Sequence, residues 1–175
     1  MYRFALDPYH TEVEFKIKHL MISTVRGRFN SFSGSMESPS LSNFSGAQIE
    51  FECKVDSIDT GVKDRDDHLR SSDFFNVEKY PNMTFHSTDI SRKGDGYSVA
   101  GHLTICGVSR PITLDAEFNG RDQDTEGNMK YGFDMDGVID RKDFGLTFQA
   151  FGGAGQMMVG EKVVIQISAQ MAPTK

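Results

Sequence analysis

Apolar and charged residues alternate one by one along several stretches of this 175-residue chain, and this period of two constrains its fold more than any other feature. In TEVEFKIK (11–18), the residues Val13, Phe15 and Ile17 are apolar, and each is flanked by charged residues. A period of two places alternate side chains on opposite faces of a β-strand. The same pattern predicts strands at 47–55, 97–105, 112–119, 130–139 and 162–171, with weaker ones near Arg28–Met36, Met83–Ile90 and Phe144–Phe151.

The predicted strands follow one another through short turns such as RKGDG (92–96), which indicates antiparallel pairing. The length fits a single domain over residues 1–175. Such strands can close into a barrel or stack as a sandwich. The chain has no Trp but 14 Phe and 9 Met, which favours an all-β, antiparallel eight-stranded barrel. A barrel of that size is filled by side chains or holds one small ligand, and both alternatives stay open.

The net charge of −6 and an isoelectric point of about 5.3 argue against a nucleic-acid partner, which needs a basic surface. The same charge argues against tight electrostatic docking on anionic lipid. The two cysteines, Cys53 and Cys106, are expected to be reduced thiols. No apolar run of about 18 residues is present, so no membrane-spanning segment is expected. Because no signal peptide is visible, we expect a cytoplasmic protein, or a periplasmic or secreted one if a leader was removed.

Only residues 61–80 break the alternation, and DRDDHLRSSDFF (64–75) is the unusual part of this segment. KDRDDHLRS predicts a helix, with Asp66 and Arg70 as a stabilising pair at i,i+4. SSDFF predicts the start of a second short helix, with Ser71 or Ser72 as its N-cap. We therefore expect a short helical excursion near residues 62–79.

Two chemical interpretations of this segment are weak. A metal site would combine the carboxylates of residues 64–67 with His68, but a catalytic zinc usually needs a second histidine, and none lies nearby. Catalysis by Ser, His and Asp would combine His68 with Asp73 and Ser71 or Ser72, but no G-x-S-x-G nucleophile turn is present. We therefore expect neither a metal nor a catalytic residue.

A structural interpretation of the same segment is stronger. The charged helix would cap one mouth of a barrel, with Phe74 and Phe75 turned inward. Its polar residues would form an ion-pair network that orients the helix rather than adding much stability. The members of that network would be Arg65, Arg70, Asp66 and Asp73.

Polar residues at strand ends are candidates for recognising a ligand head group. His19 lies where the first alternation ends, and Arg26, Arg28 and Arg141 each lie close to a Gly and a Phe. An arginine at a barrel rim can offer its guanidinium to a polar head group. An ordinary surface arginine explains the same pattern equally well.

Five segments share a further likeness. They are LDPYHTEVEFKIKHLMISTVRGRFNSFSG (6–34), DSIDTGVKDRDDHLRSSDFFNVEKYPNMTFHST (56–88), GHLTICGVSRPITLDAEFNG (101–120), GVIDRKDFGL (137–146) and VGEKVVIQI (159–167). Together they resemble the YceI-like family of polyisoprenoid-binding proteins, in order and over nearly the whole chain. The segment at 56–88 is the most specific.

The resemblance implies an extended, lipocalin-like barrel of eight antiparallel strands around an apolar tunnel that holds a polyisoprenoid or similar chain. It also implies a lipid carrier or store with no established reaction. Family members are often periplasmic or secreted, and they are commonly dimers. The chain departs from the family at Cys106, where the resemblance leads us to expect a basic residue.

We predict that the protein binds a long-chain amphiphilic lipid for transport, storage or sequestration. That lipid is a polyisoprenoid, its quinone-precursor or phosphate derivative, or a fatty-acid derivative. The alternatives are an enzyme or isomerase acting on an isoprenoid-like substrate, and a structural or partner-binding barrel without ligand. We expect no cofactor besides the lipid, and a homodimer. The predicted tunnel residues are Phe15, Ile17, Phe29, Ile49, Phe51, Phe74, Phe75, Phe85, Leu103, Ile105, Phe133 and Phe148, and the predicted polar mouth is His19, Arg26, His68 and Arg141.

Overall fold

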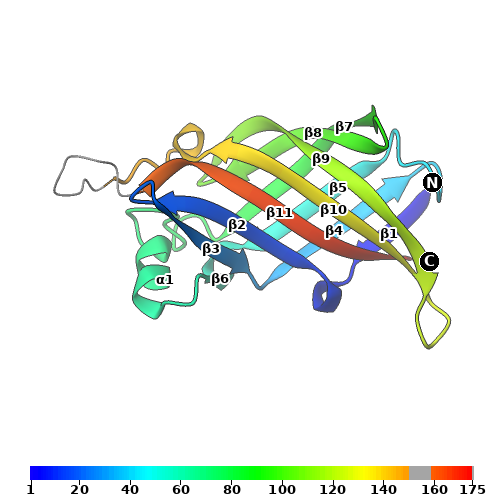
Figure 1. Cartoon of the computed structure of the whole chain (residues 1–175), viewed down its shortest axis with the longest axis horizontal. Coiled ribbons are helices and arrows are strands. Elements are labelled where there is room, and N and C mark those ends of the chain that lie inside the picture. Colours follow the sequence, from blue (N-terminus) through cyan, green and yellow to red (C-terminus); the bar gives the residue numbers. More distant parts are fainter. Residues whose placement is uncertain (150–158, 175) are drawn as a thin grey trace.

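The computed structural model describes residues 1–149 and 159–174, and within them the chain forms eleven strands, one α-helix and three short 3-10 helices (Figure 1). The strands are β1 (Tyr2–Leu6), β2 (Glu12–His19), β3 (Ser23–Phe29), β4 (Phe32–Ser38), β5 (Gln48–Lys54), β6 (Ile58–Asp59), β7 (Asn82–Lys93), β8 (Gly96–Ile105), β9 (Val108–Gln123), β10 (Met129–Asp140) and β11 (Val159–Pro173). The helices are η1 (Pro8–His10), η2 (Val55–Ser57), α1 (Lys63–Arg70) and η3 (Arg141–Phe144).

Eight strands of the described chain close into a ring of antiparallel pairs, in the order β1-β4-β5-β7-β8-β9-β10-β11, and β1 pairs with β11 to complete it. The closing strand β11 changes partner along its length. Its last residues pair with β1 from Met171 to Pro173, whereas its earlier residues pair with β2 from Val159 to Ser168. The predicted antiparallel eight-stranded barrel is therefore confirmed.

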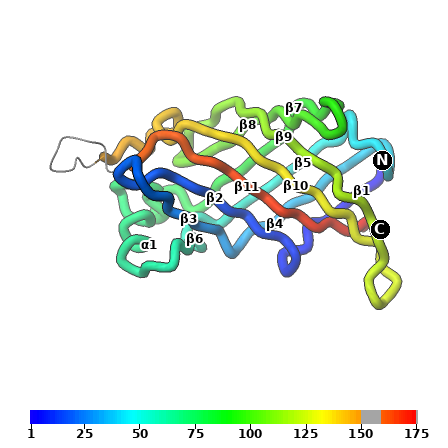
Figure 2. The backbone as a smooth tube through the Cα atoms, in the orientation of Figure 1, coloured from blue at the N-terminus to red at the C-terminus, as the bar shows by residue number. Residues whose placement is uncertain are grey.

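The barrel is elongated, and its two ends differ (Figure 2). Both chain termini lie at one end, which we call the terminal end. At the other end, β2, β3 and β6 extend the wall beside α1. We call this second end the helical end. The helical excursion predicted near residues 62–79 is confirmed there, because α1 lies within it.

Period-two alternation explains which side chains face the interior. Along β8, Tyr97, Val99, Leu103 and Ile105 are all buried, as the alternation at 97–105 predicts. Buried apolar residues from β1, β4, β5, β7, β9 and β10 meet them inside the ring. The hydrophobic core is thus the inner face of one closed sheet rather than the contact between two sheets.

Three strand predictions need correction. The strands β1 and β6 were not predicted, because five and two residues offer too short an alternation. The single strand predicted at Arg28–Met36 is two strands, β3 and β4, which break at Asn30 and Ser31 where the chain passes from pairing with β2 to pairing with β5. The strand predicted at Phe144–Phe151 is wrong over 144–149, where η3 ends and no strand follows, and residues 150 and 151 lie outside the described residues.

An aromatic cluster around Phe44 fills the terminal end of the barrel. Phe44 belongs to the connection between β4 and β5 and is only 2% exposed. Its ring makes edge-to-face contacts with Phe118 and Phe133, each with centroids 5.0 Å apart, and with Phe4 at 6.3 Å. Its backbone N–H donates to the Tyr97 hydroxyl at 3.1 Å. This loop residue therefore acts as a plug.

We predict that Phe44→Ala lowers the free energy of unfolding by about 3–5 kcal/mol, since it removes a buried ring and its aromatic contacts. Urea unfolding followed by circular dichroism measures the loss. Tyr9→Ala is the matched control, because Tyr9 is 93% exposed and its truncation should cost less than about 0.5 kcal/mol. Equal losses of unfolding free energy in the two variants would contradict the role of Phe44 as a plug.

Candidate ligand-binding cavity

An apolar cavity of about 540 Å³ lies inside the barrel. Its wall runs from the Phe44 plug at the terminal end to side chains of α1 and of the chain that follows α1 at the helical end. All twelve residues predicted to form a tunnel lie on this wall: Phe15, Ile17, Phe29, Ile49, Phe51, Phe74, Phe75, Phe85, Leu103, Ile105, Phe133 and Phe148. That a ligand occupies this space stays a prediction.

Phenylalanine rings shape the helical half of the cavity. Phe15 and Phe29 lie with their centroids 5.6 Å apart, and Phe29 meets Phe75 edge to face at 6.2 Å. Gly27 on β3 lies directly opposite Phe15 on β2 and leaves room for the Phe15 ring. A Cβ atom at Gly27 would lie 2.3 Å from the Phe15 ring. The wall therefore depends on one small inward-facing residue.

Further wall residues were missed in the sequence. Val99 shares β8 and its inward face with Leu103, which was predicted, whereas Leu114 on β9 and Ile167 on β11 follow the alternation of strands from which no tunnel residue was chosen. Phe44 is different, because it belongs to a connection without period-two alternation. Nothing in its immediate sequence distinguishes it from an exposed loop residue.

His68 lies on the cavity wall at the helical end, with its side chain 45% exposed. The edge of its ring meets Phe74 at 5.1 Å and Phe148 at 5.0 Å between centroids. Its Nε2 atom lies 2.9 Å from Oδ2 of Asp73. The imidazole is thus held at the boundary between the apolar wall and solvent, where a polar mouth residue was predicted.

The charged residues of α1 fasten the helix to the chain before it. The buried Asp66 carboxylate accepts hydrogen bonds from the backbone N–H of Thr60 at 2.9 Å and from its hydroxyl at 2.5 Å. Arg65 donates to the Thr60 hydroxyl at 2.7 Å and to its carbonyl at 2.6 Å. Both charged side chains therefore form hydrogen bonds with the backbone and the hydroxyl group of Thr60.

The predicted pair of Asp66 and Arg70 does not form, because both side chains are already bound elsewhere. Arg70 donates to the carbonyl oxygens of Asp56 at 2.9 Å and Ile58 at 3.0 Å, and to the Asp67 carboxylate at 3.1 Å. The predicted network of Arg65, Arg70, Asp66 and Asp73 is thus corrected to separate contacts. Most of these contacts reach the backbone, which positions α1 over the barrel end.

The second helix predicted at SSDFF is also wrong, because residues 71–75 form turns. Ser71 ends α1 rather than starting a helix, and its hydroxyl donates to the His68 carbonyl at 2.6 Å. That hydroxyl is therefore directed at a backbone oxygen, while the imidazole pairs with Asp73. Among the described residues, no group of three or more His, Cys, Asp or Glu side chains could hold a metal ion.

Arg141 lies on the cavity wall, but its guanidinium is not free for a head group. The residue is 4% exposed. It donates to the carbonyl oxygens of Gly160 at 2.8 Å, Leu146 at 2.6 Å and Phe148 at 2.8 Å. Burial lowers the pKa of the guanidinium from its usual value. The predicted mouth role is therefore corrected: Arg141 ties the backbone after η3 to the start of β11.

Of the two remaining predicted mouth residues, Arg26 and His19, only one lines the cavity. Arg26 is exposed on the outer face of β3 and does not line the cavity, because Val25, Gly27 and Phe29 take the inward positions of that strand. The mouth prediction for Arg26 is thus wrong by the parity of the strand. His19, at the end of β2, does line the cavity.

Cys106 does not face the cavity at the position where a basic residue was expected. It lies in the turn between β8 and β9, and its thiol donates to the carbonyl oxygen of Phe75 at 3.4 Å. Burial raises the pKa of this thiol. Its role here is therefore to contact the backbone that carries the two phenylalanines.

The fold and the cavity define a closed antiparallel β-barrel with an apolar interior. The family model described as the YceI-like domain matches residues 4–171, and the chain belongs to this family. No helix in the described parts of the chain is both long and apolar enough to cross a bilayer.

Several proteins of known sequence or structure are similar to this chain. A UPF0312 protein of Pectobacterium atrosepticum is 40% identical over 146 residues, which are 83% of this chain and 76% of that protein. The YCEI protein of Campylobacter jejuni has a crystal structure that is similar with a TM-score of 0.74 and 34% identity, over 91% of each chain. A structure described as a polyisoprenoid binding domain from Saccharophagus degradans is similar in fold alone, with a TM-score of 0.70 and 15% identity over 98% of each chain.

We predict that Arg141→Met lowers the free energy of unfolding by about 2–3 kcal/mol, because it leaves buried carbonyl oxygens without a donor. Urea unfolding measures this loss. Arg28→Met is the matched control, since Arg28 is exposed and lies 3.9 Å from its nearest carboxylate, that of Asp59. If Arg141→Met were as stable as the control, the guanidinium would not hold this backbone together.

Proposed function

We propose that the protein binds one long-chain amphiphilic lipid in its cavity, for transport, storage or sequestration. The observation that carries this proposal is the cavity itself, whose 540 Å³ is bounded almost wholly by aliphatic and aromatic side chains. Moving an apolar chain from water into such a space is favourable by about 25 cal/mol per Å² removed from water. A long chain therefore needs few polar contacts to bind.

Two further observations support a lipid-binding barrel. The chain belongs to the YceI-like family, and the related Saccharophagus degradans structure is described as a polyisoprenoid binding domain. We therefore favour a polyisoprenoid, or its quinone-precursor or phosphate derivative, over a fatty-acid derivative. The proposal requires no cofactor besides the lipid. Homodimerisation and the cellular compartment stay predictions.

The alternatives have less support. A structural barrel without ligand should be filled by its own side chains, whereas this one encloses a large cavity. An enzyme needs a reactive group beside the ligand, and His68 is the strongest candidate on the wall. Its imidazole is paired with Asp73 and packed against two phenylalanine rings that also contact each other. Family and cavity together suggest a binding protein rather than an enzyme.

Native mass spectrometry of freshly purified protein, followed by solvent extraction of the bound molecule, tests the proposal. We expect one prenyl or acyl lipid per chain, recovered chemically unchanged. The same spectra give the mass of the assembly and so test the homodimer. Protein that is free of lipid and takes up none from prenyl lipid would contradict the proposal.

We predict that Phe51→Asp abolishes lipid retention, because it places a carboxylate on the apolar wall. His68→Ala should leave the lipid bound, because it removes a group at the mouth and leaves the wall intact. Glu52→Ala is the matched control, since Glu52 is exposed on the outer face of the same strand. The fraction of lipid-loaded protein is read by native mass spectrometry, with circular dichroism as the check on folding.

Equal loss of lipid in Phe51→Asp and His68→Ala would show that the distinction between wall and mouth is wrong. If Phe51→Asp failed to fold, Ile49→Asn would serve as a second wall variant. Ile49 lines the same cavity two residues earlier on β5, and the uncharged amide is easier to bury than a carboxylate.

A further inference from the structure

The turn between β2 and β3 is strained in an unusual way. Leu20 and Met21 adopt left-handed backbone conformations, with φ angles of 52° and 59°. The N–H of Ile22 donates to the carbonyl of His19 at 3.2 Å and closes the turn. Such turns strongly prefer Asn and Gly, because a bulky side chain is crowded at positive φ. The chain therefore has apolar side chains at a turn where other residues would fit the backbone better.

The same turn leaves its apolar side chains in water. Met21 is 51% exposed and Ile22 is 83% exposed. The turn lies at the helical end of the barrel, directly after His19, which lines the cavity. Exposed apolar side chains next to a cavity mouth are typical of an interaction site.

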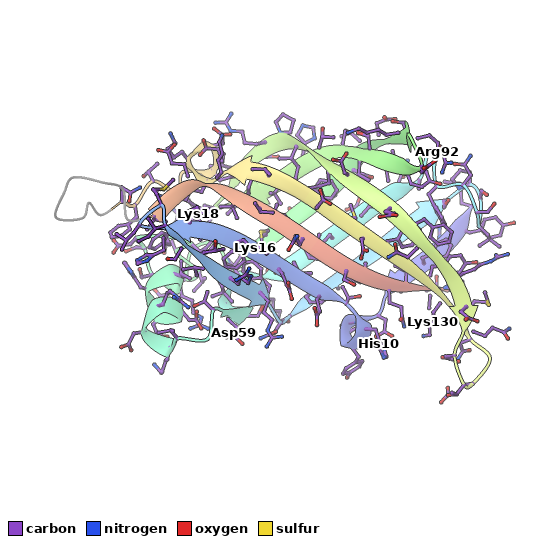
Figure 3. All side chains as sticks on the ribbon, viewed as in Figure 1. His10, Lys16, Lys18, Asp59, Arg92 and Lys130 are labelled. Carbon is purple, nitrogen blue, oxygen red and sulfur yellow. The ribbon has the colours of Figure 1, made fainter. Side chains whose placement is uncertain are left out.

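Cations lie on the outer face directly behind this apolar tip. Lys16 on β2 is directly opposite Arg26 on β3, and two like charges in register repel each other. Neither they nor Lys18 form an ion pair within the described residues, whereas Lys142 and Lys162 pair with Glu161 and Asp140. Figure 3 shows Lys16 and Lys18 toward the helical end.

One group of acidic residues adjoins these cations on the outer surface. Glu12, Glu14, Glu117, Asp134 and Asp136 lie around one shallow depression formed by β2, β9, β10 and β11. Glu14 lies two residues before Lys16 and four before Lys18 on β2, which is about 7 Å and about 13 Å along the strand. Screening at physiological salt acts over about 8 Å. Lys18, the cation nearest the tip on β2, therefore lies beyond the screening length from the carboxylates of this depression, whereas Lys16 lies within that length of Glu14.

We infer that the β2–β3 tip and the cations behind it dock the cavity mouth onto an anionic lipid bilayer. Met21 and Ile22 would enter the boundary between head groups and acyl chains, and Lys16, Lys18 and Arg26 would face anionic head groups. A bilayer of this kind offers a match for both features, because its head groups attract the cations and its acyl chains accommodate the apolar side chains. The functional role of a tip beside the mouth rests on the proposed lipid-binding function. Docking on a bilayer can be measured independently of that function.

Vesicle co-sedimentation at low salt tests the inference. Wild-type protein should bind vesicles of equal parts phosphatidylglycerol and phosphatidylcholine, and should bind pure phosphatidylcholine vesicles much more weakly. Lys16→Gln with Arg26→Gln should lower the partition coefficient on anionic vesicles about 30-fold, at about fivefold per cation. Met21→Ser with Ile22→Ser should lower it about tenfold or more.

The matched control is Arg92→Gln with Lys130→Gln, which removes the same charge from the terminal end of the barrel (Figure 3). This variant should bind anionic vesicles as well as the wild type does. Wild-type protein that does not bind anionic vesicles would overturn the inference and leave an acidic protein as the partner of this surface. Equal losses in the control and in the tip variants would overturn it as well.

Native mass spectrometry of the same variants separates docking from lipid carriage. Lipid-loaded tip variants that no longer bind vesicles would support docking and show that the barrel is intact. If wild-type protein bound anionic vesicles but carried no lipid, the docking surface would stand and the proposed function would fail. The two proposals can thus fail independently.

Discussion

The partner change of β11 is the interaction on which the rest of the structure depends. Because one strand pairs with β2 along its first part and with β1 at its end, the sheet closes while its wall continues beyond β1. Closure leaves no free edge within the ring of eight strands and turns the inward apolar positions of those strands toward a common interior. With Phe44 filling the terminal end, the remaining space lies toward the helical end. The cavity is thus a consequence of how the ring closes.

Buried charges in this protein mainly satisfy backbone groups. Arg141 donates to carbonyl oxygens from both sides of the β10–β11 connection, and Asp66 accepts from Thr60 before α1. Irregular backbone near an apolar interior needs such partners, because an unpaired polar group costs more than the hydrogen bond contributes. Arg141 was predicted as a head-group ligand and Asp66 as the partner of Arg70, yet both side chains instead bond to the groups named above. Polar recognition at the mouth is therefore left to few side chains, of which His19 and His68 line the cavity.

The sequence predicts features that follow from a repeating pattern, and it misses contacts that only one residue makes. Alternation identified the longer strands and those of the predicted wall residues that lie on them, because inward parity follows from position within a strand; Phe74, Phe75 and Phe148 lie on the wall without belonging to a strand. The same parity could have placed Arg26 on the outer face, because Val25, Gly27 and Phe29 form the inward series. Gly27 has no apolar side chain, so the alternation is difficult to recognise there. Phe44 and the backbone bonds of Arg141 depend on contacts between distant segments. No local pattern encodes such contacts, so they required the folded structure.

A cavity of this kind poses a problem of transfer that the outer surface can address. Exposing an apolar chain to water costs about 0.8 kcal/mol per CH₂ group, so a chain of about 20 carbons would meet a barrier of about 16 kcal/mol. A carrier that opens into free solution must cross that barrier, whereas one whose mouth rests on a bilayer passes the chain from one apolar phase to another. The apolar tip and the cations behind it lie at the end of the barrel where the cavity wall becomes polar and partly exposed. The inner faces of β2 and β3 would then line the ligand cavity, and their outer faces would contact the membrane beside its mouth.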